Sequence, residues 1–301
     1  MGMPTNIGII DTMMGTRAGA TAKTQNYAFL KQGQLKDADS QNMNFPAQYM
    51  FKDVPFSDQA RGSSGPVDEP PQGAELLLPE MDKWGVERAM VGISPQNEIG
   101  LKTVQGHPDR FFGAYEVDPN KGMDEIRTLV MMYEKYGIKA ATAFPAGLLP
   151  QVPINDKKFY PFYAKCVELD IPIFCTVGIC GPRIPSAPQH CELVDEVCWF
   201  FPELKFIMRH GAEPWTDLAV KLMLKWPNLY YSTSAFSPKY YPDEIIRFAN
   251  TRGADKIMYA GYFPMGLSLD RIFTELPNVG FKDEVWPKFL RENAMKVLNL
   301  S

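Results

Sequence analysis

The sequence predicts an α/β fold, a (β/α)8 TIM-like barrel that forms a single domain over residues 1–301. Three observations predict it. Short apolar runs alternate with amphipathic segments along most of the chain, as in the β-α units that build a parallel sheet. Eight such apolar runs can be counted, which is the number of strands that closes this barrel. A length of 301 residues is also ordinary for a single barrel domain.

The expected elements follow one another with short turns between them. The strand candidates are short apolar runs at residues 7–11, 88–93, 112–117, 138–144, 172–177, 204–209, 229–234 and 256–260. The helix candidates show apolar residues at helical spacing, at residues 76–84, 122–136, 159–169, 190–200, 215–224, 242–250 and 286–299. Active sites of such barrels lie at the carboxyl ends of the strands, so we look for functional residues there.

Residues 12–75 interrupt this alternation with a long insertion after the first strand. The segment is rich in Gly, Ser, Gln, Asn and Pro, but it also holds apolar patches at residues 27–30 and 45–51. Loops of this length are rarely structureless in a compact domain. Because the insertion follows a strand, we expect it on the active-site face, as a lid or as an oligomer contact. The two roles can coexist, and a homodimer is the expected assembly.

Composition excludes several classes of partner. The net charge is -4 with both signs interspersed, which argues against a nucleic acid or an anionic membrane as partner. No run of about 18 apolar residues is present, so we expect no membrane span. The amino terminus lacks the basic and apolar regions of a signal peptide. We therefore expect a cytoplasmic protein whose partner is a small-molecule substrate.

The five cysteines form an odd set without a C-x-x-C pair. Reduced and mostly buried thiols are the simplest interpretation. Cys175 and Cys180 lie near the expected mouth of the barrel, so a catalytic thiol paired with a histidine is the alternative.

Several local patterns, taken in order, carry a family resemblance. The chain opens with Ile10-Asp-Thr-Met-Met-Gly15, continues through Phe201-Pro-Glu-Leu-Lys-Phe-Ile-Met-Arg-His-Gly211, and ends with Tyr259-Ala-Gly-Tyr-Phe-Pro264 followed by Glu292-Asn-Ala294. This order resembles the amidohydrolase-related family that includes the aminocarboxymuconate-semialdehyde decarboxylase-like proteins. The resemblance runs nearly from end to end, except in residues 12–75. It implies a barrel hydrolase or lyase that normally binds a divalent metal.

The chain departs from the family pattern at the metal positions. The resemblance places the two first-strand histidines on Met13 and Gly15, the fifth-strand histidine on Thr176 and the eighth-strand aspartate on Tyr262. Thioether, hydroxyl and phenol groups are poor ligands for such a metal. We therefore expect no metal and no other cofactor. A weak site built from Asp11 and His210 stays open as an alternative.

His210 and Tyr262 are the expected catalytic residues. The resemblance places His210 at the sixth-strand position, and an imidazole can exchange a proton near neutral pH. The Tyr262 phenol could hold a substrate carbonyl or a developing oxyanion, or could simply fill space. Arg209 alternates with His210 along a strand, so it should face the helices if His210 faces the interior. The expected substrate-binding residues are Met13, Arg17, Thr176, Arg183, Glu213, Trp215, Ser232 and Ser234.

These residues predict a metal-independent, amidohydrolase-like hydrolase. It would cleave a C–C or acyl bond (ester, lactone or thioester) of a small, aromatic or acyl substrate, with His210 as general acid or base. One alternative is a decarboxylase in which Arg183 binds the carboxylate and His210 protonates the carbanion. The other is a non-catalytic binding protein on a barrel whose site has decayed. We expect His107 and His190 to have only turn or capping roles.

Overall fold

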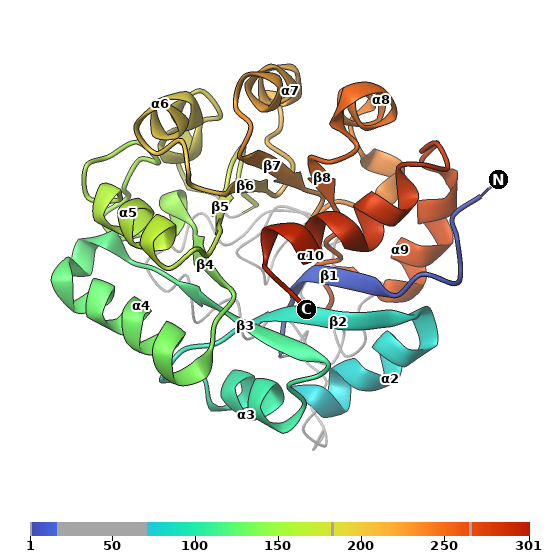
Figure 1. Ribbon diagram of the computed structural model, residues 1–301, viewed down its shortest axis with the longest axis horizontal. Helices are drawn as coiled ribbons and strands as arrows, with labels where there is room; N and C mark the ends of the chain where they lie inside the picture. The colour runs from blue at the N-terminus through green and yellow to red at the C-terminus, as the bar shows by residue number, and fades with distance from the viewer. Residues whose placement is uncertain (1, 17–70, 182–183, 265–266) are drawn as a thin grey trace, which may run out of the picture.

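A computed structural model of the chain confirms the predicted (β/α)8 barrel. It describes residues 2–16, 71–181, 184–264 and 267–301. Eight parallel strands form one sheet in the order of the sequence, and the helices surround it (Figure 1). Residues after the last strand return to the first, where the Tyr262 N–H donates to the Met13 carbonyl at 3.0 Å. The sheet is therefore nearly closed.

The elements alternate as a barrel requires. The strands are β1 (Ile9–Met14), β2 (Val86–Gly92), β3 (Phe111–Glu116), β4 (Ala140–Ala143), β5 (Ile173–Thr176), β6 (Phe206–Arg209), β7 (Leu229–Ser232) and β8 (Ile257–Met258). The helices are α2 (Ala74–Trp84), α3 (Glu98–Gly106), α4 (Met123–Tyr136), α5 (Tyr160–Glu168), α6 (Leu193–Phe200), α7 (Thr216–Lys225), α8 (Asp243–Phe248), α9 (Leu269–Glu275) and α10 (Asn293–Val297).

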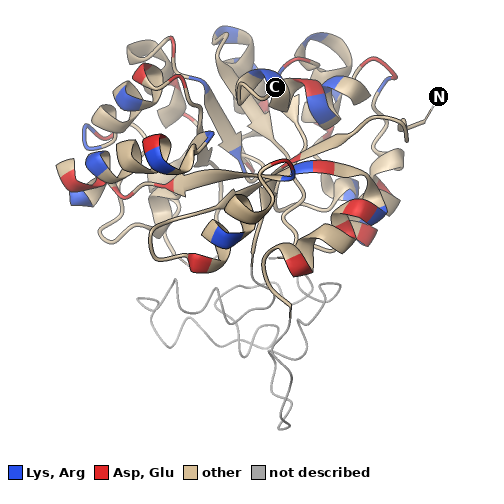
Figure 2. Ribbon diagram, turned by 60° about the horizontal axis from the view of Figure 1, so that its bottom comes forward, with Lys and Arg blue, Asp and Glu red and all other residues tan. Residues whose placement is uncertain are grey.

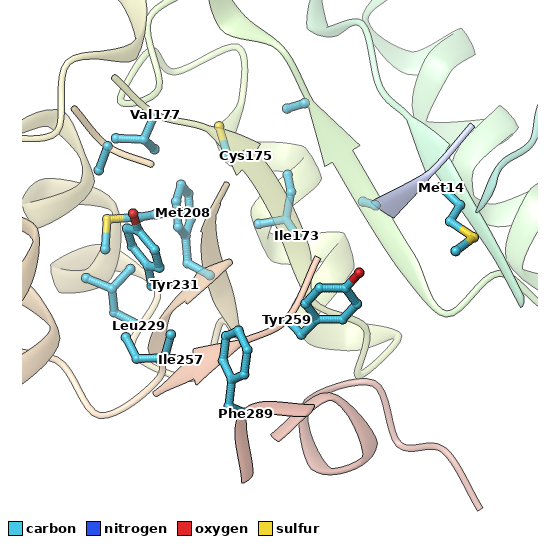
Figure 3. Packing of buried hydrophobic residues seen from close by; sticks show 14 of the residues in the cluster. Met14, Ile173, Cys175, Val177, Met208, Leu229, Tyr231, Ile257, Tyr259 and Phe289 are labelled. Carbon is cyan, nitrogen blue, oxygen red and sulfur yellow. The ribbon is translucent and has the colours of Figure 1, made fainter. Parts of the chain in front are cut away.

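Outward-facing strand residues make the larger part of the core. Side chains of successive strand residues point to opposite faces, so every second one meets the helices. Figure 3 shows this layer between sheet and helices, with labelled residues that include Met14, Ile173, Cys175, Met208 and Tyr231. Burial of this apolar surface holds the helices against the barrel wall.

Inward-facing residues fill the barrel itself. Ile10, Phe112, Phe174, Ile207 and Met258 form a second buried cluster together with residues of the carboxyl-terminal helix α10. Arg88, near the start of β2, donates to the Ser301 carbonyl at 3.2 Å, which places α10 at the amino-terminal end of the barrel. That end is therefore closed, and the opposite end carries the loops that follow the strands.

Two helices were missed by the sequence prediction, α3 and α9. Each is short, and each begins at a polar side chain that caps it: Asn97 accepts from the Gly100 N–H, and Ser268 accepts from the Arg271 N–H. The last predicted helix, at residues 286–299, consists of a π-helical turn at Lys288–Glu292 followed by α10.

The insertion after β1 lies mostly outside the described residues, because residues 17–70 are not among them. Its two ends meet, since the Gly73 N–H donates to the Thr16 carbonyl at 2.7 Å. The predicted lid or oligomer contact stays a prediction.

The described surface carries charges of both signs. Figure 2 shows Lys and Arg interspersed with Asp and Glu over the outer helices. Among the described helices, none combines the length and the apolar character that a membrane span requires.

Candidate active site

A layer of hydroxyl groups lines the inner wall at the carboxyl ends of the strands. The residues that carry them are Thr12 on β1, Thr142 on β4, Thr176 on β5 and Ser232 on β7. Each of the four lies two positions after an inward-facing apolar residue, so its side chain also faces the interior. All four are buried, and the hydroxyls of Thr12 and Ser232 lie 3.5 Å apart. Above the apolar core, the barrel interior thus becomes polar.

Arg209 points into the same layer, which corrects the expectation that it faces the helices. It lies two positions after the inward-facing Ile207, and only 5% of it is exposed. Its Nε donates to the Thr176 Oγ1 at 3.2 Å, and its Nη2 contacts the Glu116 Oε2 at 3.3 Å. The expectation was wrong because β6 ends at Arg209, so the strict alternation does not extend to His210.

His210 turns back toward the mouth because its backbone leaves the strand conformation. Its φ of 67° lies in the left-handed region, which non-glycine residues adopt rarely and often at functional sites. Its Nδ1 lies 2.9 Å from the Ser234 Oγ, and the same oxygen accepts the His210 N–H at 3.2 Å. Ser234 therefore fixes both the backbone and the ring of His210.

The Tyr262 ring packs against the ring of His210. The two rings are 5.2 Å apart between centroids and meet edge to face. Tyr262 also has a positive φ, of 73°, and its backbone is joined to Met13. Burial raises the pKa of its phenol to about 12, Arg209 lowers it and Glu116 raises it, so the hydroxyl stays protonated at neutral pH. It is a hydrogen-bond donor close to both charges.

Asp11 lies behind the barrel wall rather than at the mouth. Its Oδ1 accepts the N–H groups of Met13 and Gly261, each at 2.9 Å. Its Oδ2 and the Tyr259 hydroxyl are buried without a well-aligned hydrogen-bond partner among the described residues. Burial raises the pKa of Asp11 to about 7, against the lowering effect of the Gly261, Met13 and Tyr259 contacts. The alternative of a weak metal site shared by Asp11 and His210 has no support in this geometry.

The remaining donors also do not fit the divalent metal that the family resemblance implies. The Met13 sulfur accepts from the Arg209 Nη1 at 3.8 Å, and the Thr176 hydroxyl accepts from the same guanidinium. A fixed cation therefore contacts two of the positions at which the family carries metal ligands. Among the described residues, no group of three or more His, Cys, Asp and Glu could hold a metal ion.

The other predicted substrate-binding residues are only partly brought together. Thr176 and Ser232 belong to the buried polar layer, Met13 contacts Arg209, and Ser234 contacts His210. Glu213 lies near the outward-facing Tyr231, whose pKa is raised by burial and then by the Glu213 charge. The Trp215 ring lies against the ring of His190, with 3.8 Å between the centroids and an angle of 45° between the planes. Arg17 and Arg183 lie outside the described residues, so their roles stay predictions.

The other two histidines have the local roles that the sequence predicts. The His190 Nδ1 accepts the Glu192 N–H at 3.2 Å just before α6. The His107 carbonyl accepts the N–H groups of Arg110 and Phe111 in the turn before β3. Neither contributes to the polar layer at the mouth.

The thiols give little support to a catalytic cysteine. Cys175 faces the helices in the outer core layer (Figure 3), and burial raises its pKa to about 12. Burial also raises the pKa of the Cys180 thiol, which lies 3.2 Å from the Ser186 Oγ. A nucleophilic cysteine needs the opposite shift, toward the thiolate.

Comparisons with known proteins place this arrangement in a family. A 2-keto-4-carboxy-3-hexenedioate hydratase from Sphingobium sp. is 26% identical over 133 residues, which cover 38% of this chain and 39% of the hydratase. Two solved structures share the fold. An uncharacterised TIM-barrel protein from Bordetella bronchiseptica has a TM-score of 0.71 and 20% identity, over 98% of this chain and 99% of that one.

The second structure is a 5-carboxyvanillate decarboxylase from Novosphingobium aromaticivorans with bound manganese. It has a TM-score of 0.64 and 15% identity, over 98% of both chains. The model of the amidohydrolase family matches residues 64–300 of this chain. Because that match covers most of the sequence, this chain belongs to the amidohydrolase family.

Proposed function

We propose that the protein is a metal-independent hydrolase of a small aromatic or acyl substrate, with His210 as general acid and base. It cleaves a C–C or acyl bond, such as that of an ester, lactone or thioester. Family membership supports a hydrolase or a carboxy-lyase. The observation that carries the proposal is the convergence of His210, fixed by Ser234, with the Tyr262 phenol at the open end of the barrel.

These groups suffice for hydrolysis of an activated carbonyl. His210 takes a proton from water as the water oxygen attacks the carbonyl carbon, and the carbonyl electron pair moves onto oxygen. The Tyr262 hydroxyl, which stays protonated, donates a hydrogen bond to that oxyanion. When the tetrahedral adduct collapses, the bond to the leaving group breaks, and His210 returns the proton to the leaving atom.

A carboxy-lyase is the second candidate, because a decarboxylase shares the fold over nearly the whole chain. In that reaction the bond to the carboxylate breaks, carbon dioxide leaves, and the electron pair remains on carbon. Protonated His210 then delivers its proton to that carbon. Water labelled with oxygen-18 separates the two reactions, since only hydrolysis places the label in the newly formed acid group.

Substitution of His210 tests the proposal. Wild type and His210→Ala would be assayed on p-nitrophenyl acetate, dihydrocoumarin and 2,6-dihydroxybenzoate. We expect kcat for the substrate that is turned over to fall by roughly 10²–10⁴-fold in the variant. His190→Ala is the matched control, because the His190 ring accepts the Glu192 N–H and lies against Trp215, and the variant should keep most of the activity.

Two outcomes would contradict this function. Full activity in His210→Ala would exclude the acid–base role. If none of the three compounds is turned over while one of them binds at the mouth, the non-catalytic binding protein becomes the better account.

The assembly and the location of the protein are also proposals. We infer a homodimer, on the strength of the apolar patches in residues 27–30 and 45–51, and a cytoplasmic location. Light scattering coupled to size-exclusion chromatography tests the first, since a monomer at working concentration would contradict it.

A further inference from the structure

Arg209 is a buried cation whose contacts are weak for a charged group. Its Nη1 faces the Met13 sulfur at 3.8 Å, and its Nη2 lies 3.5 Å from the Ala143 carbonyl and 3.3 Å from Glu116. Hydrogen bonds between a guanidinium and a carboxylate are usually about 2.7–2.9 Å long and often bidentate. Burying a charge is costly unless strong partners compensate. The Nη1–Nη2 edge of Arg209 is therefore the part of the guanidinium with the weakest partners.

Glu116 is a loosely held counter-ion. It ends β3 on the inward-facing side, yet 61% of its side chain is exposed to solvent. It reaches Arg209 with one oxygen only, at 3.3 Å. Ion pairs with a solvated partner contribute little to stability, so a second anion can replace Glu116 at small cost.

The surroundings of the guanidinium suit a carboxylate. Thr176 accepts from the Nε, so the guanidinium keeps a fixed orientation, and its Nη groups contact Met13 and the largely exposed Glu116 instead. The Tyr262 phenol responds to the charges of both Arg209 and Glu116, which places a hydroxyl donor close to the same spot. One guanidinium fork with neutral hydroxyl donors matches a singly charged, planar anion.

We propose that Arg209 forms an anion subsite at the barrel mouth that binds the substrate carboxylate, and that Glu116 is the resting counter-ion which this carboxylate displaces. The inference rests on the proposed function and deepens it, because it assigns the substrate a carboxylate close to the bond that His210 and Tyr262 act on. The incoming carboxylate makes two parallel hydrogen bonds with the Nη groups, and Glu116 turns into solvent.

Nuclear magnetic resonance of the Arg209 side chain tests the subsite without any turnover. The Nε–H signal would be assigned by its loss in Arg209→Lys and followed during titration with acetate. Acetate is small enough to reach any open carboxylate subsite, and acetamide is its neutral control. We expect acetate, but not acetamide, to shift the signal. Glu116→Gln, an exposed and isosteric change, should tighten acetate binding by roughly two- to fivefold.

A second variant removes the charge. Arg209→Met should weaken acetate binding by at least about tenfold, read from the methyl relaxation of acetate itself. An Arg209 signal that acetate and acetamide leave equally unchanged would overturn the subsite. Weaker acetate binding in Glu116→Gln would overturn the counter-ion role. His210→Ala should leave acetate binding unchanged, so failure of the catalytic proposal and failure of the subsite are distinguishable.

Discussion

Replacement of Asp11 by Asn should make the protein more stable at alkaline pH. The carboxyl group is fully buried, and its pKa in the folded state is raised to about 7 from an ordinary value of 3.8. The folded state therefore holds the proton more tightly than the unfolded state. The stability of the wild type rises as the pH falls from about 7 toward about 4, and Asp11 adds no further change outside that window.

The size of the effect follows from this difference in pKa. A difference of that size between folded and unfolded states corresponds to at most about 4 kcal/mol at pH values above the folded pKa. Asn cannot ionise, and its carbonyl oxygen can still accept the N–H groups of Met13 and Gly261. We therefore expect Asp11→Asn to exceed the wild type by roughly 2–4 kcal/mol at about pH 8.5 and by less than about 1 kcal/mol at about pH 4.5.

Urea denaturation at both pH values measures this difference. Asp109→Asn is the control, because Asp109 is exposed and should change stability little at either pH. A stability difference between Asp11→Asn and wild type that is the same at both pH values would refute the reasoning. So would an Asn variant that is less stable than the wild type at the higher pH.

Two further predictions concern the groups around His210. Tyr262→Phe should lower kcat by roughly ten- to a thousandfold with little change in KM, because the phenol donates to an oxyanion that forms in the transition state. An effect confined to KM would instead assign Tyr262 to binding of the substrate in the ground state. Ser234→Ala removes the hydroxyl that contacts the His210 ring and N–H, so it should lower kcat by roughly two- to tenfold and displace the limb of the pH–rate profile that His210 controls. An unchanged pH profile in this variant would show that Ser234 does not orient the imidazole.

The fold could be predicted because the strands of a parallel barrel are buried on both faces. Such strands appear in the sequence as short apolar runs, for example around Phe206 and Ile207, and eight of them were visible. Helix α3 was missed because the residues it buries, Gly100 and Thr103, make no apolar stripe. Helix α9 was missed because its apolar stripe of Leu269, Ile272 and Phe273 spans little more than one turn.

The site could be predicted only in part. Thr176 and Ser232 follow the alternation of their strands into the polar layer. Met13 was placed by the resemblance and reaches Arg209 where the pairing of β1 is irregular, and Arg209 was assigned to the wrong face. That error came from extending the alternation of β6 by one residue, across a His210 whose φ of 67° ends the strand. A left-handed histidine leaves no signature in the sequence, because non-glycine residues adopt this conformation only when their surroundings impose it.

Asp11 was misplaced for a related reason. The resemblance puts it beside the family's metal positions, whereas alternation with the inward-facing Ile10 sends its side chain behind the wall. Its contact with the Gly261 N–H joins residues 250 positions apart, which local pattern cannot reveal.

Metal content is the most direct test of the central claim that this site works without a bound metal. The protein would be expressed with added zinc and manganese, purified without chelator and analysed by inductively coupled plasma mass spectrometry. Because Arg209 contacts Met13 and Thr176 and Asp11 faces away, we predict well under one equivalent of zinc, manganese or iron per chain. One equivalent of metal that disappears in His210→Ala would contradict the account.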